Sequence, residues 1–374
     1  MKCTINDIAV VISESIPNPA ESGYDIFVGL EHYDSGEVKV TRYGSTENLV
    51  TAVKVFKKGD ILLARRNVYL KRAGLVVFDG VTSGDSIVLR VKQDLSNLGI
   101  SSAAVQKYLP FVLNTEEFWN YAEKYSDGTM SKRLSPKTLL QYEFEIPEDV
   151  ESKNELLWAA FDAKESYRAM IRATDEMVKS QFIARFGTTE CSPFPVKFLR
   201  EISLSSGEYG ANTPATKYNP EVGRYIRITD IDEFGNLNND IVSPEVAENK
   251  YLLQKGDLLY ARTGATVGKT YLHKEGKALY AGYLIKYRFT DAVLPDFVFA
   301  YTHSQEYYQW VELTQKVGAQ PNISAKQYDG LKIIVPPIEE QKSFVALMHQ
   351  ADKSKFELKK AIEKIDKVMR ALMQ

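Results

Sequence analysis

The sequence predicts an α+β fold with two duplicated, mixed α/β domains and two long helices that pair as an antiparallel coiled coil. Three observations lead to this prediction. The 374 residues suffice for two or three domains at roughly 150 residues each. One set of motifs occurs twice, about half a chain apart. Two predicted helices repeat their apolar residues in the same heptad frame.

The duplication is clearest in one octapeptide. Lys58–Arg65 reads KGDILLAR, and Lys255–Arg262 reads KGDLLYAR 197 residues later. Further pairs keep the same order with slightly different offsets: Phe27–Leu30 with Tyr225–Ile228, Ser135 with Ser324, and Ile146-Pro147 with Val335-Pro336. This drift in offset is what loop insertions between two copies of one fold produce.

Each copy ends in a predicted helix. After Pro337 the chain lacks glycine and proline, and alternating steps of four and three residues select one stripe: Phe344, Met348, Ala351, Lys355, Leu358, Ile362, Ile365, Met369 and Leu372. Eight of these nine residues are apolar, the pattern of a coiled-coil seam. The same frame, 191 residues earlier, selects a weaker stripe with a lysine in the same slot: Lys153, Leu157, Ala160, Lys164, Tyr167, Ile171, Thr174, Val178 and Gln181.

The central helix is expected to begin near Asn154 and to end at Phe186, because Gly187 is suited to a helix C-terminal cap. The chain is thereby divided into four parts: a first domain (1–149), a central spacer helix (150–187), a second domain (188–336) and a C-terminal spacer helix (337–374). Antiparallel pairing of the helices predicts an approximate two-fold axis within one chain.

Composition and charge exclude several classes of protein. With 44% apolar and 26% charged residues, the chain is neither disordered nor collagen-like. A net charge of -2 excludes a uniformly basic nucleic-acid coat. Cys3 and Cys191 are too few for a disulfide framework or a zinc cage, and no apolar run approaches the ~18 residues of a membrane span. We therefore expect a cytoplasmic protein without a metal site or membrane contact.

No set of residues predicts catalysis. Gly264–Thr270 (GATVGKT) has three residues between its glycines where a phosphate-binding loop needs four, so we interpret it as a turn between strands. Asp257, Glu275 and Lys277 come nearest to a nuclease site, but so loose a triplet is common by chance. Two acidic pairs on the helices are interpreted as solvated faces: Asp175-Glu176 and Glu339-Glu340.

Positive charge is concentrated around the repeated octapeptide. Residues 51–72 contain seven basic residues and one acidic residue, and residues 251–274 contain four and one. Such side chains neutralise phosphates, and Arg, Asn and Gln also bind base edges. They are equally suited to solvated strand edges, where they discourage aggregation. Their recurrence at equivalent places in both copies favours nucleic-acid binding.

Five segments link the chain to a known family. In the second copy they are Gly223–Ile231 (GRYIRITDI), Lys255–Thr270 (KGDLLYARTGATVGKT) and Gly318–Gln341 (GAQPNISAKQYDGLKIIVPPIEEQ), and in the first copy Lys57–Asp85 and Asp127–Pro136. In these segments, and in their duplicated order, the chain resembles the DNA specificity subunits of type I restriction-modification systems, which act in phage defence.

The resemblance implies a non-catalytic subunit. Each domain would be a target-recognition domain that reads one half of a split double-stranded DNA sequence. The paired helices would set the spacing and dock two methyltransferase subunits, which restriction (translocase) subunits would join. S-adenosylmethionine would bind to the methyltransferase subunits, and ATP and Mg²⁺ to the restriction subunits, with no cofactor on this chain. The alternative is a protein-interaction scaffold of the same architecture that does not bind DNA.

The candidate DNA-binding residues lie in or beside the turns that follow the matched strands. In the first domain they are Arg65, Arg66, Asn67, Tyr69, Lys71, Arg72, Lys132 and Arg133, and in the second Arg262, Thr263, Lys269, Gln320 and Asn322. The first copy departs from the family pattern in two places. Ser131–Ser135 (SKRLS) replaces the Gln320–Ser324 string (QPNIS), which predicts a differently built loop, and the short segment before Tyr24 predicts a reduced start of the domain.

Overall fold

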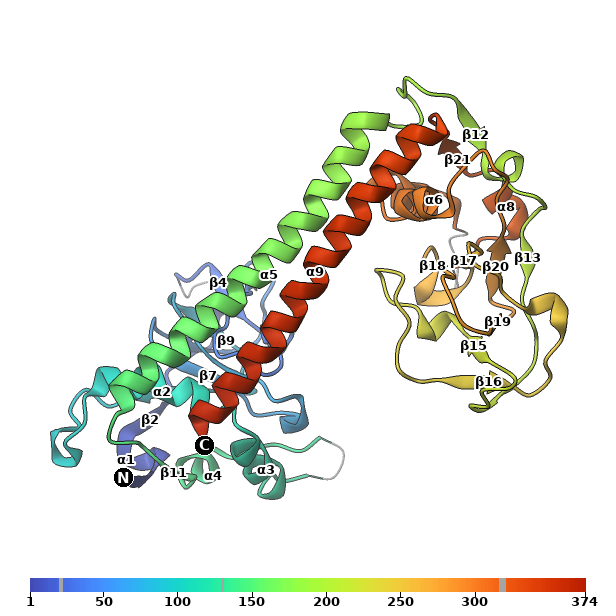
Figure 1. Cartoon of the computed structure of the whole chain (residues 1–374). Coiled ribbons are helices and arrows are strands. Elements are labelled where there is room, and N and C mark those ends of the chain that lie inside the picture. The colour runs from blue at the N-terminus through green and yellow to red at the C-terminus, as the bar shows by residue number, and fades with distance from the viewer. Residues whose placement is uncertain (20–22, 129–130, 316–320) are drawn as a thin grey trace. The chain divides into compact units, whose positions relative to one another are not determined.

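The computed structural model describes residues 1–19, 23–128, 131–315 and 321–374. The chain divides into two compact units. The first unit comprises Met1–Tyr167 and Lys360–Gln374, and the second comprises Arg168–Lys359. Each unit therefore contains part of both long helices, α5 (Val150–Phe186) and α9 (Ile338–Met373) (Figure 1).

The first unit is built on a four-stranded antiparallel sheet in the order β2-β10-β7-β8. A five-stranded sheet, β3-β6-β9-β4-β5, and the pair β1-β11 complete its β structure. Its elements are β1 (Lys2–Thr4), α1 (Ile5–Ile8), β2 (Ala9–Ile12), β3 (Ser15–Ile16), β4 (Ile26–Val28), β5 (Gly44–Ser45), β6 (Val53–Phe56), β7 (Ile61–Ala64), β8 (Ala73–Leu75), β9 (Gly80–Thr82), β10 (Ser86–Val91), α2 (Ser102–Val112), α3 (Glu116–Lys124), α4 (Pro136–Leu140) and β11 (Glu143–Glu145).

The second unit repeats this topology. Its four-stranded sheet has the order β13-β20-β17-β18, β12 pairs with β21, and β15 pairs in parallel with β19 as β4 does with β9. Its elements are β12 (Val196–Phe198), β13 (Glu208–Tyr209), β14 (Ala215–Lys217), β15 (Arg224–Ile226), β16 (Val242–Pro244), β17 (Leu258–Ala261), β18 (Thr270–Leu272), β19 (Ala278–Tyr280), β20 (Leu284–Tyr287), α6 (Pro295–Tyr301), α7 (Gln305–Thr314), α8 (Ala325–Asp329) and β21 (Lys332–Ile334). The predicted α+β duplication is confirmed.

The octapeptide contains one of the two inner strands of each four-stranded sheet, β7 or β17. Because successive strand residues point to opposite faces, Ile61 and Leu63 of β7 pack in one core and Leu62 and Ala64 in another. β17 divides its four buried residues between two cores in the same way. An apolar run without alternation is therefore the expected sequence for this strand, since both of its faces are covered.

The aspartate of the octapeptide has a structural role in both units. Arg90 donates to both carboxylate oxygens of Asp60, from Nε and Nη2, at 2.7 Å each. Arg288 makes the equivalent two-pronged contact with Asp257 at 2.6 and 2.8 Å. Both aspartates are buried, so this paired geometry compensates for their loss of hydration.

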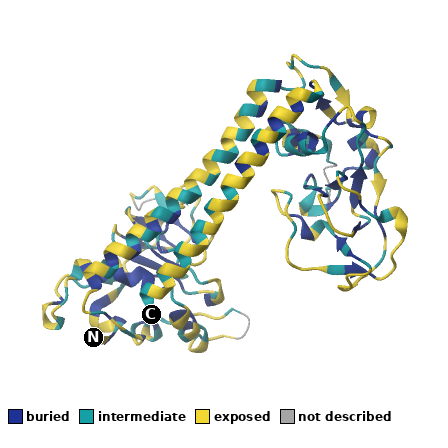
Figure 2. Cartoon of the chain, viewed as in Figure 1, coloured by how far each residue is buried: buried dark blue, intermediate teal, exposed yellow. Residues whose placement is uncertain are grey.

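The two long helices pair in antiparallel orientation, and every residue of both predicted seams is buried or half-buried (Figure 2). In the first unit, Met369 and Leu372 of α9 pack on the main core. In the second unit, Phe182 of α5 lies 5.3 Å from Phe344 of α9, centroid to centroid. α5 begins four residues earlier than expected and ends at Phe186, where Gly187 has φ +74. The four-part division of the chain remains a prediction.

Two expectations about charge and chain length are wrong. Asp175 is not on a solvated face, because its carboxylate pairs with Nζ of Lys355 at 2.7 Å across the helix seam. The start of the first domain is not reduced, because β1 and β2 are equivalent to β12 and β13 and complete the same sheets. Strands of only two to four residues give too weak a periodic signal to be found from sequence.

Candidate nucleic-acid interface

In the first unit, the turn after β7 lies beside the segment before α4. The Arg65 carbonyl accepts a hydrogen bond from the Leu134 N–H at 2.9 Å, and the Asn67 N–H donates to the Lys132 carbonyl at 2.9 Å. Arg66 and Arg133 face each other in the resulting bridge. Two loops that are distant in sequence are thereby fixed into one surface.

The second unit contains the same arrangement. The Ile323 N–H donates to the Arg262 carbonyl at 2.9 Å, and the Gly264 N–H donates to the Pro321 carbonyl at 3.0 Å. Thr263 and Asn322 form the equivalent bridge. The expectation of a differently built loop in the first copy is therefore wrong, since these main-chain bonds do not depend on which side chains the loops carry. Gln320 lies outside the described residues.

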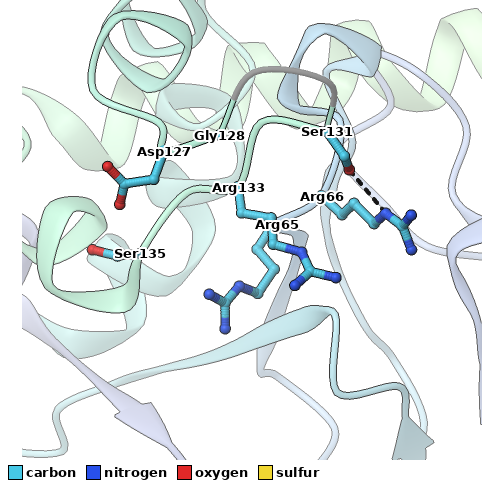
Figure 3. A pocket seen from close by; sticks show the side chains of 7 residues that line it. All are labelled: Arg65, Arg66, Asp127, Gly128, Ser131, Arg133 and Ser135. Atoms are coloured by element: carbon cyan, nitrogen blue, oxygen red, sulfur yellow. Dashed lines mark hydrogen bonds between the residues drawn. The ribbon is translucent and has the colours of Figure 1, made fainter.

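Three arginines converge on the surface of the first unit. Arg65, Arg66 and Arg133 line an open recess of about 420 Å³, together with Asp127, Gly128, Ser131 and Ser135 (Figure 3). Nε of Arg66 donates to the Ser131 hydroxyl at 2.9 Å, and that hydroxyl donates to the side-chain oxygen of Asn67 at 3.1 Å. These hydrogen bonds hold the Arg66 guanidinium in a defined position at the recess.

Arg65 and Arg262 occupy the same position in the two units. Within the described residues, the Nε atom of each is buried without a hydrogen-bond partner. The guanidinium of Arg262 stacks over the Tyr209 ring, 4.7 Å from its centroid. Both arginines therefore have unused donor capacity, although burial costs each of them hydration.

The turn after β7 is strained. Asn67 has φ 55 and Lys71 has φ 48, in the left-handed region where the equivalent residues of the second unit are Gly264 and Gly268. The strained turn carries Tyr69 at its tip, where the side chain is 59% exposed. Nζ of Lys71 lies 2.6 Å from a carboxylate oxygen of Glu116. Non-glycine residues in this conformation cost about 1–3 kcal/mol each and occur often at functional sites.

Other candidate residues lie apart from the recess or bond to the main chain. Arg72 donates to the Leu30 and Arg66 carbonyls, and burial lowers its pKa. Lys132 is exposed and donates to the Glu123 carbonyl at 3.3 Å. In the second unit, Thr263 is buried, and Nζ of Lys269 donates to the Ile231 carbonyl at 3.4 Å.

Sequence reasoning missed Asp85 and Ser131, which contact the arginines of the recess. The Asp85 carboxylate lies 3.4 Å from Arg133 and 3.7 Å from Arg66. Both residues lie in segments that resemble the family, Lys57–Asp85 and Asp127–Pro136, but neither was among the candidate DNA-binding residues. The signal that could have found Asp85 is its place just before the strand Ser86–Val91, which pairs with the octapeptide strand.

The two rejected sequence motifs have structural roles. Gly264–Thr266 forms a 3-10 turn between β17 and β18, which confirms the interpretation of GATVGKT as a turn. Asp257 is paired with Arg288, and Lys277 donates to the Glu221 carbonyl, so two members of the triplet with Glu275 have structural partners. Within residues 1–19, 23–128, 131–315 and 321–374, no cluster of three metal-ligand side chains occurs, and no helix there is long and apolar enough to cross a bilayer.

Solved structures share this fold along the whole chain. One, from work on the complex assembly and conformational transition of the type I R-M system, is 17% identical with a TM-score of 0.57, over 100% of this chain and 96% of that one. The S subunit of a type I restriction-modification system from M. genitalium is 14% identical with a TM-score of 0.54, over 100% and 96% of the two chains. No curated protein sequence matches the chain.

Residues 199–367 match the family model for the type I restriction modification DNA specificity domain. The matched residues make up most of the second unit, which therefore carries a type I restriction modification DNA specificity domain. The matched region contains β15, β17, α8 and most of α9, and the repeated topology relates the first unit to it.

Proposed function

We propose that the chain is the DNA specificity subunit of a type I restriction-modification system, and that each of its units reads one half of a split target in double-stranded DNA. The observation that carries this proposal is the loop pair of the interface, which occurs in both units with the same main-chain bonds and with Arg65 or Arg262 at the same position. A single-site binder would have no use for two such surfaces. Two copies with different side chains suit two different half-sites.

The chemistry of the loops fits DNA. Arginine binds phosphates and makes bidentate contacts with guanine, while asparagine does so with adenine. The first unit offers Arg65, Arg66 and Arg133, and the second offers Arg262 and Asn322 beside it. Because the main chain holds the loops, little ordering of the protein is needed on binding.

We further propose that the long helices dock methyltransferase subunits. α5 has a second heptad stripe that lies outside its seam with α9 and carries no charge: Leu156, Ala159, Ala163, Ser166, Met170, Ala173, Met177, Ser180 and Ala184. Its large members are solvent-exposed, with Leu156 at 53%, Met170 at 52% and Met177 at 44%. Such a stripe suits the apolar face of a partner helix.

The stripe and the duplicated fold together support two methyltransferase subunits, joined by restriction subunits. S-adenosylmethionine would then bind to the methyltransferase subunits, and ATP and Mg²⁺ to the restriction subunits. The assembly would act in the cytoplasm, where its DNA lies, and protect the cell against phage.

The test is the base-resolution DNA methylation pattern of the native host with and without this gene. We expect deletion to remove one split motif, with two short defined halves around a fixed unread gap. Plasmid-borne copies of the gene would restore it. A methylation pattern that stays the same in the deletion strain, although the methyltransferase is expressed, would contradict the proposal.

A further inference from the structure

We propose that Asp85 sets the base preference of the first unit by holding Arg66 and Arg133 in position to read a G·C pair. This inference rests on the proposed function and adds a base class and a positioning residue to it. The Asp85 side chain is 28% exposed, so it is partly sheltered yet reaches the surface. Its Oδ1 lies 3.4 Å from Nη2 of Arg133, and its Oδ2 lies 3.7 Å from Nη1 of Arg66.

Asp85 belongs to neither of the two loops that supply these arginines. It precedes β10, and its carbonyl accepts a hydrogen bond from the Arg65 N–H at 2.9 Å. Three chain segments therefore meet at this carboxylate. Arg66 is held from a second direction by Ser131, which leaves its guanidinium with few alternative positions.

The second unit shows what changes between the copies at this place. The Arg262 N–H donates to the Tyr283 carbonyl at 3.1 Å, so Tyr283 occupies the position of Asp85. Its side chain is 60% exposed. By the same equivalence, Thr263 occupies the position of Arg66, and Asn322 occupies the position of Arg133. The first unit thus has an Arg–Asp–Arg cluster where the second has three neutral side chains.

Positions that are identical in both units cannot distinguish two half-sites, whereas these three can. An arginine reads guanine by donating two hydrogen bonds to O6 and N7, and the geometry must be right for both. A carboxylate between two arginines fixes their side chains before DNA arrives, which lowers the entropy lost on binding. A carboxylate also repels phosphates, so its presence favours contacts with base edges over contacts with the DNA backbone.

The inference predicts an unusual pair of effects for Asp85→Asn. Loss of the charge frees Arg66 and Arg133, so discrimination at one G·C position is expected to fall about tenfold. Loss of a negative charge also removes repulsion of phosphates, so methylation is expected to spread to additional sites rather than to disappear. Glu148→Gln, which removes one exposed negative charge in the loop before α5, controls for charge alone.

The experiment replaces the native gene by each variant and reads the host methylation pattern at base resolution. We expect Asp85→Asn to admit A·T at one position that is G·C in the wild-type motif, with the other half-site unchanged. Asp85→Glu, which keeps the carboxylate, is expected to retain the wild-type motif. The unchanged half-site shows that the second unit still binds, and immunoblotting shows that the protein is present.

Three results would overturn the inference. One is an Asp85→Asn pattern identical to that of the wild type. Another is a change at a position that is not G·C in the wild-type motif. The third is loss of all methylation by Asp85→Asn at normal protein level. In each case the wild-type split motif still stands, so the proposed function survives. If the wild-type gene produces no split motif, the proposed function fails together with the inference.

Discussion

Lys164 of α5 pairs with an aspartate of α9, and Lys355 of α9 pairs with the equivalent aspartate of α5. Nζ of Lys164 lies 2.9 Å from Asp366 of α9, and Nζ of Lys355 lies 2.7 Å from Asp175 of α5. The two lysines are 191 residues apart, as are the two aspartates. Charged residues at a helix seam fix its register and orientation, because a shifted helix would leave them unpaired.

Removal of the Lys164 ammonium is expected to destabilise the first unit. Lys164 is buried and is paired with both Asp366 and Glu37, so Lys164→Ala removes the counter-charge that it gives to the partly buried Asp366 carboxylate and one ion pair of Glu37. We expect a loss of about 2–3 kcal/mol in the free energy of unfolding, measured by urea denaturation. Lys179→Ala, which removes an exposed pair with Glu176, is expected to cost less than about 0.5 kcal/mol. Equal losses for both variants would show that the seam ion pair contributes no more to the free energy of unfolding than an exposed pair does.

Glycine at position 71 is expected to relieve strain. Lys71 has φ 48, whereas the equivalent Gly268 has φ 87 without a Cβ penalty. In a Glu116→Ala background, which first removes the ion pair, Lys71→Gly is expected to raise the free energy of unfolding by about 1 kcal/mol. Thermal unfolding of the single and double variants checks this. Lower stability of the double variant than of Glu116→Ala alone would refute the strain argument.

Replacement of Arg65 and Arg66 with alanine is expected to weaken DNA binding. Each arginine that contacts a phosphate releases about one counterion, so the slope of log affinity against log salt is expected to decrease by about 1–2. Arg42→Ala, which removes an exposed arginine paired with Asp34, is the matched control. Fluorescence anisotropy over a salt series measures both quantities. Unchanged affinity and unchanged base preference would remove Arg65 and Arg66 from the interface.

If the paired helices set the gap between half-sites, longer helices are expected to lengthen the gap. Seven residues inserted at equivalent places in α5 and α9 preserve the heptad frame and add roughly 10 Å, about 3 base pairs. The methylation pattern of the host would then show the same two half-sites around a wider gap. Altered half-sites around the original gap would contradict this role of the helices.

Acid is expected to weaken the second unit through the buried His273 and the half-buried His303. Burial lowers the pKa of His273 and of His303, so both favour the neutral form in the folded state. The unfolded chain binds protons more readily, and stability is therefore present above pH ~6.5 and lost as the pH falls below that value. Unfolding measured between pH 5 and 8 tests this. His273→Gln is expected to flatten the profile, and an unchanged profile in that variant would exclude His273 as a source.

The sequence was most informative where structure is local or repeated. The octapeptide revealed an inner strand of the four-stranded sheet in each unit, and the heptad frame revealed the helix seam, including the slot shared by Lys164 and Lys355. The partners of those lysines were not recognised, because Asp175 has the sequence surroundings of an ordinary exposed helix residue. Asp85 was missed for a related reason: its contacts with Arg66 and Arg133 exist only once three distant segments have folded together.

The candidate interface also combines residues that the sequence identified with features that it did not. Residues next to the octapeptide were found because they adjoin a strong motif. Three other features depend on tertiary packing, which the spacing of residues in the sequence does not encode. They are the hydrogen bond of Arg72 to the main chain, the burial of Thr263 and the left-handed conformation of Lys71.

The division of the octapeptide strand between two cores bears on how the arginines behave in solution. Ile61 and Leu63 pack into one core on one face of β7. Leu62 and Ala64 pack into another core on the opposite face, directly before Arg65. A strand anchored from both faces cannot tilt or slide unless two sets of packed side chains yield at once. The recess therefore rests on a rigid strand, and if it reads DNA as we propose, it is expected to discriminate against a mismatched sequence by not deforming to fit it.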